Sequence, residues 1–180
     1  MLTVVIPYRG DAKRRLPVEL RAAVALALLG DVVDAALPLG RVIVVTDDPS
    51  VVSPDAEAFA DPGGGQGAAV LAGLEAVEGH TLIVNADLPL ATPDALRRLA
   101  AAGLALVESA DGTTNALSLP DPRIFEPLYG EASAARFRAH APFAAVEIPE
   151  LAEDVDSLAD LERLAPLAGP RTRTLLAVRA

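Results

Sequence analysis

The sequence predicts an α/β fold, with a mostly parallel sheet that carries helices on both sides. Apolar segments rich in valine, isoleucine and leucine alternate with segments of helical pattern. The apolar segments are continuous, as in strands that are buried on both faces. Such alternation is typical of parallel sheets covered by helices. With 180 residues the chain can bury a sizeable core, and a single domain over residues 1–180 is expected.

The predicted elements follow one another in a regular order. The opening MLTVVIPYRG is interpreted as a strand, because it lacks the basic start and the cleavage site of a signal peptide. The predicted strands are Leu2–Pro7, Arg41–Thr46, Thr81–Asn85, Leu104–Glu108, Ala116–Leu119 and Ala144–Ile148, with 172–178 as a candidate for another. The predicted helices are Val18–Leu29, Gln66–Val77, Pro93–Ala102, a helix around Ala134–His140, and Leu158–Leu164.

Composition excludes several kinds of chemistry. The chain has no cysteine and two histidines, which excludes disulfides, thiol nucleophiles and a histidine-based zinc site. The formal net charge of −10 argues against a nucleic-acid surface. No segment resembles a membrane span, because Glu19 and Arg21 interrupt the most apolar helix. We therefore expect a cytoplasmic protein with neither nucleic-acid nor membrane partners, whose chemistry depends on carboxylates, hydroxyls, amides and cations.

A cluster of cations follows the first predicted strand. Arg9, Lys13, Arg14 and Arg15 lie close together in an otherwise acidic chain, and Lys13 is its only lysine. A lone ammonium among so many guanidinium groups suits a phosphate as a compact point charge. The cluster therefore predicts an anion site, and a solvated loop is the alternative.

In an open α/β sheet, ligands bind outside the carboxyl ends of the strands. The second predicted strand ends in Thr46, Asp47 and Asp48, and the third leads to Asp87. The loop 62–67, PGGGQG, precedes a helix, and its glycines would let backbone N–H groups approach a ligand closely. Alone, this loop is as consistent with a flexible surface turn. All these residues are expected at one edge of the sheet.

Three carboxylates predict a metal site. Asp87 follows a buried strand, and Pro89 stiffens the backbone behind it. Asp154 and Asp156 are two residues apart, so in an extended chain they would point to the same side while Val155 points into the core. Like charges this close favour a bound cation, and Mg²⁺ suits such oxygens. The alternatives are a turn or cap aspartate and a solvated acidic helix start.

Five segments together resemble a known family. They are 5-VIPYRGDAKRRL-16, 84-VNADLPLATPDAL-96, 111-DGTTNAL-117, 129-YGEASAARFRAHA-141 and 153-EDVDSLADL-161. In content and order they resemble the phosphoenolpyruvate and 2-phospho-L-lactate guanylyltransferases of coenzyme F-420 biosynthesis. The resemblance covers nearly the whole chain. It implies a single-domain, Rossmann-like nucleotidyltransferase of the glycosyltransferase-A type.

The resemblance also implies a reaction. Such enzymes transfer GMP from GTP to the phosphate of phosphoenolpyruvate, 2-phospho-L-lactate or 3-phospho-D-glycerate, and they release pyrophosphate. The partners implied are therefore GTP and a small phosphorylated carboxylic acid. The alanine- and arginine-rich, lysine-poor composition suggests a GC-rich bacterial genome, and bacterial members of the family are associated mainly with phosphoenolpyruvate. The sequence leaves open whether the protein is a homodimer.

Residues are assigned to this reaction by the family motifs. Asp87, Asp154 and Asp156 would hold one or two Mg²⁺ ions, or Mn²⁺, and they are catalytic together with Lys13. The residues implied in substrate binding are Arg9 and Arg14 at the triphosphate, Gly65 and Gln66 in the glycine loop, and Thr114, Gly130 and Ser133 at the acceptor's carboxylate.

The chain departs from the family pattern in two places that matter. The first motif is shorter than usual, with Arg9 where lysine is common. The glycine loop has Gly-Gln-Gly at 65–67 where the family usually has Gly-Leu-Asn, so base recognition is less defined than catalysis. His140 is expected to be a structural imidazole bonded to the loop 130–133. His80 is interpreted as a surface turn residue.

Two other functions stay open at this point. The chain could transfer a nucleotide to molybdopterin or a sugar phosphate, although those relatives usually open with a glycine-rich motif that this chain lacks. It could also be a noncatalytic nucleotide-binding module, although Asp87, Asp154 and Asp156 argue against that.

Overall fold

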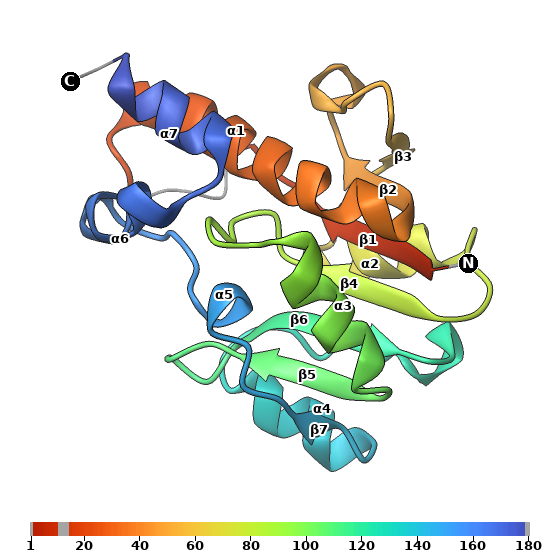
Figure 1. The fold of residues 1–180 in the computed structure, drawn as a ribbon. Coiled ribbons are helices and arrows are strands. Elements are labelled where there is room, and N and C mark those ends of the chain that lie inside the picture. The colour runs from red at the N-terminus through yellow and green to blue at the C-terminus, as the bar shows by residue number, and fades with distance from the viewer. Residues whose placement is uncertain (1, 11–14, 179–180) are drawn as a thin grey trace.

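The structure is a computed structural model that describes residues 2–10 and 15–178. Lys13 and Arg14 therefore lie outside the described residues. Figure 1 shows a central sheet with helices on both of its faces. The α/β class predicted from the sequence is confirmed.

Within the described part of the chain, the sheet has seven strands in the order β3-β2-β1-β4-β6-β5-β7. Their bounds are Leu2–Pro7 for β1, Gly40–Thr46 for β2, Glu57–Ala60 for β3, Thr81–Val84 for β4, Ala105–Glu108 for β5, Thr114–Leu119 for β6 and Ala144–Ala145 for β7. Strands β3, β2, β1 and β4 are parallel neighbours, and β7 is parallel to β5. Only β6 runs antiparallel to its neighbours, β4 and β5. The sheet is thus mostly parallel, as predicted.

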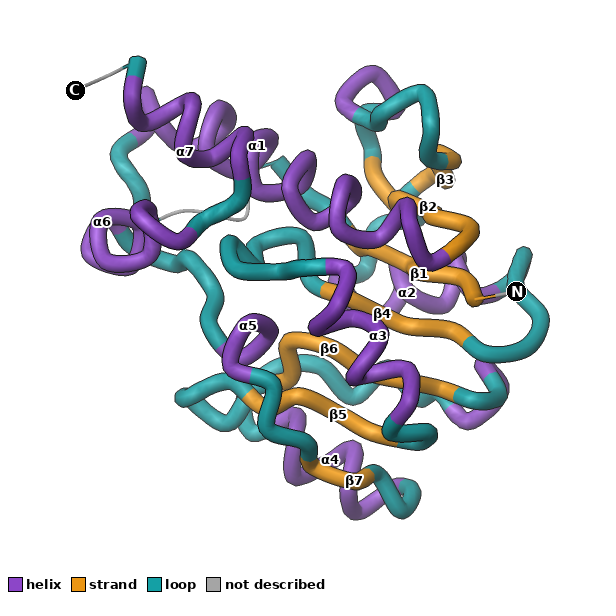
Figure 2. Tube along the Cα trace, viewed as in Figure 1, coloured by secondary structure: helices purple, strands orange, loops and turns teal. Residues whose placement is uncertain are grey.

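Helices cover both faces of this sheet. Their bounds are Val18–Ala36 for α1, Gln66–Leu74 for α2, Pro93–Ala101 for α3, Ser133–His140 for α4, Pro149–Ala152 for α5, Leu158–Leu164 for α6 and Pro170–Ala177 for α7. Helices α1, α3 and α5 share one buried cluster with the sheet, whereas α2 and α4 belong to the cluster on the other face. Figure 2 shows the loops that connect these layers.

A glycine lets α2 approach the sheet closely. A Cβ at Gly73 would lie 2.7 Å from Cγ1 of Val5 on β1 and 2.9 Å from Cγ2 of Val45 on β2. Contacts that short would force the helix away from the sheet. Gly73 therefore fixes the position of α2 and of the loop that leads into it.

Three predicted elements need correction, and one strand was missed. The predicted strand 172–178 is wrong, because this segment lies in α7. The strand predicted over Ala144–Ile148 is reduced to Ala144–Ala145. Strand β3 was not predicted, since Glu57–Ala60 has no β-branched residue and mostly exposed side chains. Helix α1 also continues beyond its predicted end at Leu29 to Ala36.

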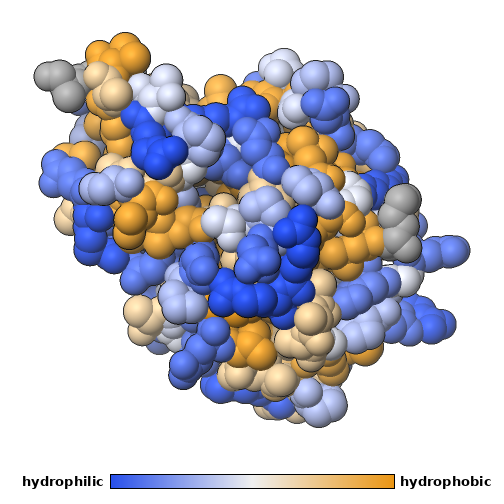
Figure 3. All heavy atoms as spheres, in the orientation of Figure 1, coloured by the Kyte–Doolittle hydropathy of each residue, from blue (hydrophilic) through white to orange (hydrophobic). Residues whose placement is uncertain are grey.

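Helix α1 with the following turn, Val18–Leu39, is long and apolar enough to cross a membrane by length and composition alone. Half of its apolar window is buried within the structure, and the helix packs on β1, β2 and α7. Figure 3 shows that hydrophobic and hydrophilic residues are mixed on the face where α1 lies. These features are those of a core helix in an α/β domain.

A carboxylate on α1 caps the N-terminus of α7. Asp31 is 4% exposed and accepts from the backbone N–H groups of Arg171, at 2.8 Å, and Thr172, at 2.9 Å. A Cβ at Gly169 would lie 2.3 Å from the carboxyl carbon of Asp31. Glycine at 169 therefore allows α1 to supply the cap that α7 does not find in its own sequence.

Replacing Asp31 with alanine is expected to lower the free energy of unfolding by about 1–3 kcal/mol, because two N–H groups at the start of α7 lose their acceptor. Urea unfolding would measure the change. The control is Asp34→Ala, one turn further along α1, which removes a half-exposed ion pair with Arg171 at 2.7 Å. That pair is expected to contribute less than about 1 kcal/mol. Equal losses in the two variants would contradict the capping role of Asp31.

Candidate active site

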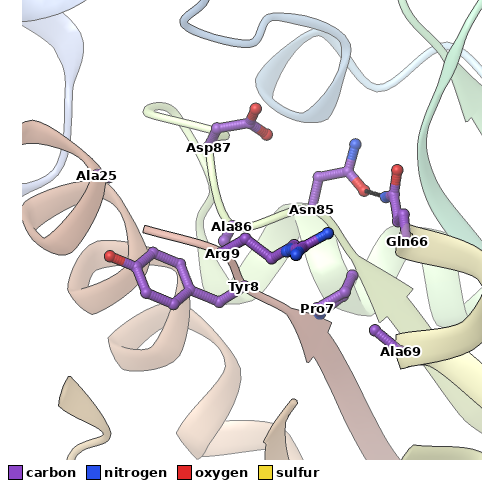
Figure 4. A pocket seen from close by; sticks show the side chains of 9 residues that line it. All are labelled: Pro7, Tyr8, Arg9, Ala25, Gln66, Ala69, Asn85, Ala86 and Asp87. Atoms are coloured by element: carbon purple, nitrogen blue, oxygen red, sulfur yellow. Dashed lines mark hydrogen bonds between the residues drawn. The ribbon is translucent and has the colours of Figure 1, made fainter. Parts of the chain in front are cut away.

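The carboxyl ends of β1 and β4 open into a pocket of about 160 Å³. Figure 4 shows side chains from the end of β1, the segments that follow β1 and β4, and helices α1 and α2 around it. Its lining consists of Pro7, Tyr8, Arg9, Ala25, Gln66, Ala69, Asn85, Ala86 and Asp87. The pocket is smaller than the roughly 300–1,000 Å³ that encloses a whole drug-sized ligand. It would therefore hold only part of a nucleotide, and the rest would lie along the open edge of the sheet.

The three predicted carboxylates meet at this edge. One carboxylate oxygen each from Asp87, Asp154 and Asp156 lies within 4.8 Å of the other two. Asp87 and Asp154 are half-buried, and Asp156 is exposed. A set of three carboxylate oxygens suits a hard divalent cation such as Mg²⁺. The sequence thus predicted correctly that these residues come together.

Hydrogen bonds hold Asp87 and the segment 154–156 together and orient the carboxylate of Asp154. The N–H of Val155 donates to the carbonyl of Asp87 at 3.2 Å. Val155 is fully buried, so its flanking carboxylates face the other way, as predicted. The hydroxyl of Ser109 donates to Asp154 Oδ1 at 3.2 Å, which orients this carboxylate.

A capping box fixes the chain immediately after Asp156. The Oδ2 of Asp160 accepts from the backbone N–H of Ser157 at 2.9 Å, and the Ser157 hydroxyl accepts in return from the N–H of Asp160. The hydrogen bond from the Ser157 hydroxyl lowers the pKa of Asp160. This reciprocal pair starts α6 and defines where the chain leaves the acidic cluster.

Arg9 is the described member of the cation cluster that lines the pocket. Its Nε lies 3.6 Å from Oδ2 of Asp61, a carboxylate whose side chain is 3% exposed. The other oxygen of Asp61 accepts from the N–H of Gly63 at 2.8 Å. Asp61 therefore links Arg9 to the glycine loop. Sequence reasoning missed Asp61, which follows the unpredicted strand β3.

The glycine loop needs its glycines. Gly63, Gly64 and Gly65 have φ angles of 79°, 85° and 96°, in a region that favours glycine. The loop delivers Gln66 to the pocket as the first residue of α2. Its Nε2 donates to Oδ1 of Asn85 at 2.6 Å. Asn85, the residue after β4, was also missed, because its role depends on a partner far away in sequence.

The residues predicted at the acceptor form a second group. Ser133 and Thr114 are buried, and the hydroxyl of Ser133 donates to that of Thr114 at 3.1 Å. This bond joins the starts of β6 and α4. Gly130 lines a separate surface hollow together with Gly65 and Gln66. The structure thus brings the glycine loop next to Gly130 and leaves the side chains of Thr114 and Ser133 beneath the surface.

The residues after β2 lie beside the pocket. Asp47 and Asp48 are exposed, and Asp48 caps a short 3₁₀ turn through the N–H of Ser50 at 3.0 Å. Tyr8, which sequence reasoning missed, lines the pocket. Burial, and next the charges of Asp48 and Asp47, raise the pKa of Tyr8. Its hydroxyl therefore stays neutral at physiological pH.

Both histidines form hydrogen bonds within the fold. His140 Nε2 bonds to the carbonyl oxygen of Ile124 at 3.0 Å, so the predicted bond to the loop 130–133 is wrong. His80 Nε2 lies 2.9 Å from the hydroxyl of Ser118, and partial burial lowers the pKa of His80. Neither histidine is among the residues that line the pocket.

Solved structures share this fold at low sequence identity. A nucleotidyl transferase from Methanothermobacter aligns with a TM-score of 0.68 at 20% identity, over 91% of this chain and 95% of that one. The 4-diphosphocytidyl-2C-methyl-D-erythritol synthase of Anaerococcus prevotii aligns with a TM-score of 0.61 at 12% identity, over 88% and 94%. The fold is therefore the one found in nucleotidyltransferases.

Sequence comparison identifies the family. Residues 10–146 match the MobA-like NTP transferase domain. The chain is 36% identical to "Phosphoenolpyruvate guanylyltransferase" of Sphaerobacter thermophilus, over 89% of this chain and 91% of that protein. It is 37% identical to "2-phospho-L-lactate guanylyltransferase" of Natrialba magadii, over 88% and 80%. The chain belongs to the family of phosphoenolpyruvate and 2-phospho-L-lactate guanylyltransferases, which confirms the resemblance found in its motifs.

Proposed function

We propose that the protein transfers GMP from GTP to the phosphate of phosphoenolpyruvate, or of 2-phospho-L-lactate, within coenzyme F-420 biosynthesis in the cytoplasm. Residues 1–180 would act as one guanylyltransferase domain. An oxygen of the acceptor phosphate attacks the α-phosphorus of GTP and forms a new P–O bond. The bond between the α-phosphorus and the oxygen that bridges the α- and β-phosphates breaks, and pyrophosphate leaves with that oxygen. The products are enolpyruvyl- or lactyl-diphosphoguanosine and pyrophosphate.

The convergence of Asp87, Asp154 and Asp156 is the observation that carries this proposal. An acidic protein must neutralise two polyanions before it can bring them together. These three residues would hold Mg²⁺, with Mn²⁺ as the alternative. The bound ion would neutralise phosphate charge and polarise the α-phosphate.

The chain's own residues divide the remaining tasks. Arg9 lines the pocket and would pair with the triphosphate, as would Lys13 and Arg14 by sequence. A group that takes a proton from the acceptor is not needed, because a phosphate monoester is already ionised at pH 7. Positioning and charge stabilisation therefore account for the catalysis we propose.

The acceptor would occupy the side of the site near Gly130. Thr114, Gly130 and Ser133 are the residues assigned to its carboxylate. Since the hydroxyls of Thr114 and Ser133 bond to each other, Gly130 is the member of this group beside the open hollow. The hollow borders Gln66, so acceptor and nucleotide would approach each other across the glycine loop.

The test is pyrophosphate release from GTP or ATP with Mg²⁺ and each of three acceptors, namely phosphoenolpyruvate, 2-phospho-L-lactate and 3-phospho-D-glycerate. We expect release that requires GTP, the divalent ion and one of the first two acceptors. Reactions without acceptor, or with EDTA, are the controls. Absence of release from every combination would support a noncatalytic module instead.

Phosphoenolpyruvate is expected to be preferred over 2-phospho-L-lactate by about tenfold to 200-fold in kcat/KM. The two acceptors differ in planarity at the carbon that bears the phosphate and in one methyl group. A difference of that size contributes only about 1–3 kcal/mol in a pocket. The direction follows from the GC-rich bacterial composition. A preference for 2-phospho-L-lactate or 3-phospho-D-glycerate would show that this reasoning is wrong.

A further inference from the structure

Two carboxamides stand among apolar walls in the pocket. Apart from Tyr8, Arg9 and Asp87, its lining consists of Pro7, Ala25, Ala69 and Ala86 and the side chains of Gln66 and Asn85. Small apolar side chains offer a triphosphate nothing to bind, but they suit the faces of a flat aromatic ring. Under the proposed function, the charged residues Arg9 and Asp87 would face the phosphates of the nucleotide. This part of the pocket therefore suits a nucleobase.

Each carboxamide is held in one orientation. Gln66 Nε2 donates to Asn85 Oδ1 at 2.6 Å, and Asn85 Nδ2 donates to the carbonyl of Thr114 at 3.3 Å. A 180° rotation of either carboxamide would exchange its oxygen and nitrogen and would place oxygen against oxygen or nitrogen against nitrogen. Asn85 therefore determines which end of the Gln66 amide is available to a ligand, and the backbone of β6 determines the same for Asn85.

Each of the two side chains keeps one polar atom that can bond to a ligand, and the two atoms have opposite polarity. Among the described residues, none bonds to Oε1 of Gln66, and Asn85 Nδ2 has a second hydrogen beyond the one given to Thr114. Figure 4 shows the Gln66 oxygen and the Asn85 nitrogen on the same side of the bond that joins the two side chains. The pair thus presents one acceptor and one donor side by side.

We infer that Gln66 and Asn85 select guanine, with Gln66 Oε1 accepting from N1–H and Asn85 Nδ2 donating to O6. This inference rests on the proposed function, which makes GTP the nucleotide. Guanine carries a donor at position 1 beside an acceptor at position 6. Adenine carries an acceptor and a donor at the same positions. In the orientation that suits guanine, adenine therefore places like polarity against both amides.

The assignment agrees with the layout of the site. Asn85 lies two residues before Asp87, so the base and the phosphates of one nucleotide would follow a single stretch of chain. Gln66 begins α2 directly after the glycine loop. Base selection would thus be performed by side chains at the ends of β4 and of the loop.

The experiment compares kcat/KM for GTP and ATP in the wild-type enzyme, Gln66→Leu and Asn85→Asp. Gln66→Leu removes the acceptor, and the GTP-to-ATP ratio is expected to fall by about tenfold to a hundredfold. Asn85→Asp keeps an acceptor for Gln66 Nε2 but puts an oxygen opposite position 6, which repels O6 of guanine and accepts from the amino group of adenine. The ratio should fall at least as far, with higher activity on ATP.

Inosine triphosphate tests which groups of guanine the two carboxamides contact. It keeps O6 and N1–H and lacks the 2-amino group, so wild-type kcat/KM is expected within about tenfold of that for GTP. A value as low as that for ATP would mean that the 2-amino group is read instead, which would overturn the assignment. An unchanged GTP-to-ATP ratio in both variants would overturn it as well.

Glu75→Gln, at the exposed end of the same helix, is the matched control and should leave the ratio unchanged. Thermal melting checks that each variant is folded, and Gln66→Leu alone suffices for the test if Asn85→Asp does not fold. Failure of the proposed function looks different, because the wild-type enzyme would then release no pyrophosphate from GTP with any acceptor.

Discussion

Replacement of Asp87 by asparagine is expected to lower kcat by at least about a hundredfold, on the scale of losing one preorganised electrostatic contact in the transition state. Asp87 lies within 4.8 Å of the carboxylate oxygens of Asp154 and Asp156, so its charge is part of any divalent-cation site at this edge. Asparagine keeps the shape of the side chain and removes the charge. Asp156→Asn is expected to have the same effect.

The fold should remain intact in both variants. Three carboxylates this close repel one another in the absence of a cation, so removing one charge should leave stability unchanged or raise it. Steady-state pyrophosphate release in the presence of Mg²⁺ tests the expected loss of activity, and urea unfolding without metal tests the expected stability. Asp94→Asn is a suitable control, because its side chain is 81% exposed on α3, away from the cluster. Full activity of Asp87→Asn would contradict the metal-site assignment.

Replacement of Lys13 by alanine is expected to lower turnover by about a hundredfold or more, because the proposed role of Lys13 is that of a point charge against the triphosphate. This expectation comes from the sequence, in which Lys13 is the only lysine. Lys13→Arg should restore only part of the activity, because the larger planar guanidinium cannot occupy the position of an ammonium.

The Lys13 variants also separate two roles. Stopped reactions with saturating GTP report kcat, and a GTP titration reports KM. Loss of a preorganised contact with the transition state lowers kcat, whereas loss of a charge that only helps to bind GTP mainly raises KM. Wild-type kinetics in Lys13→Arg would show that Lys13 contributes only general positive charge for GTP binding. Arg15→Ala serves as the control, since Arg15 is exposed and belongs to the same run of cations.

Local pattern predicted the sheet and its acidic cluster. Continuous apolar runs indicated β1, β2 and β4, and the rule that ligands bind at the carboxyl ends of strands brought Asp87 into the site. The two-residue spacing of Asp154 and Asp156 was enough to predict paired carboxylates. These features depend on neighbours in sequence or on general rules of sheet topology, so a single sequence contains them.

Long-range polar contacts were not predictable in this way. Asp31 caps α7 although it lies 141 residues before Thr172 in the sequence. Without knowledge of this cap, the β-branched residues of the segment 172–178 suggest a strand, whereas the segment lies in α7. Asn85 and Gln66 are 19 residues apart, and they form their hydrogen bond only because α2 begins beside the end of β4. Asp61 follows a strand whose residues have little strand propensity. In each case the decisive partner is determined by tertiary packing.

The position of Asp154 and Asp156 after the last strand has a consequence for biosynthesis. The seven strands found in residues 2–10 and 15–178 are complete at Ala145, whereas two of the three clustered carboxylates lie beyond it. Because the N-terminal part of a chain leaves the ribosome first, the sheet can form while the acidic cluster is still incomplete. A nascent or truncated chain that ends near Ala145 would thus carry the strands of the sheet and one carboxylate of the cluster. The acidic cluster would therefore be completed only after the sheet.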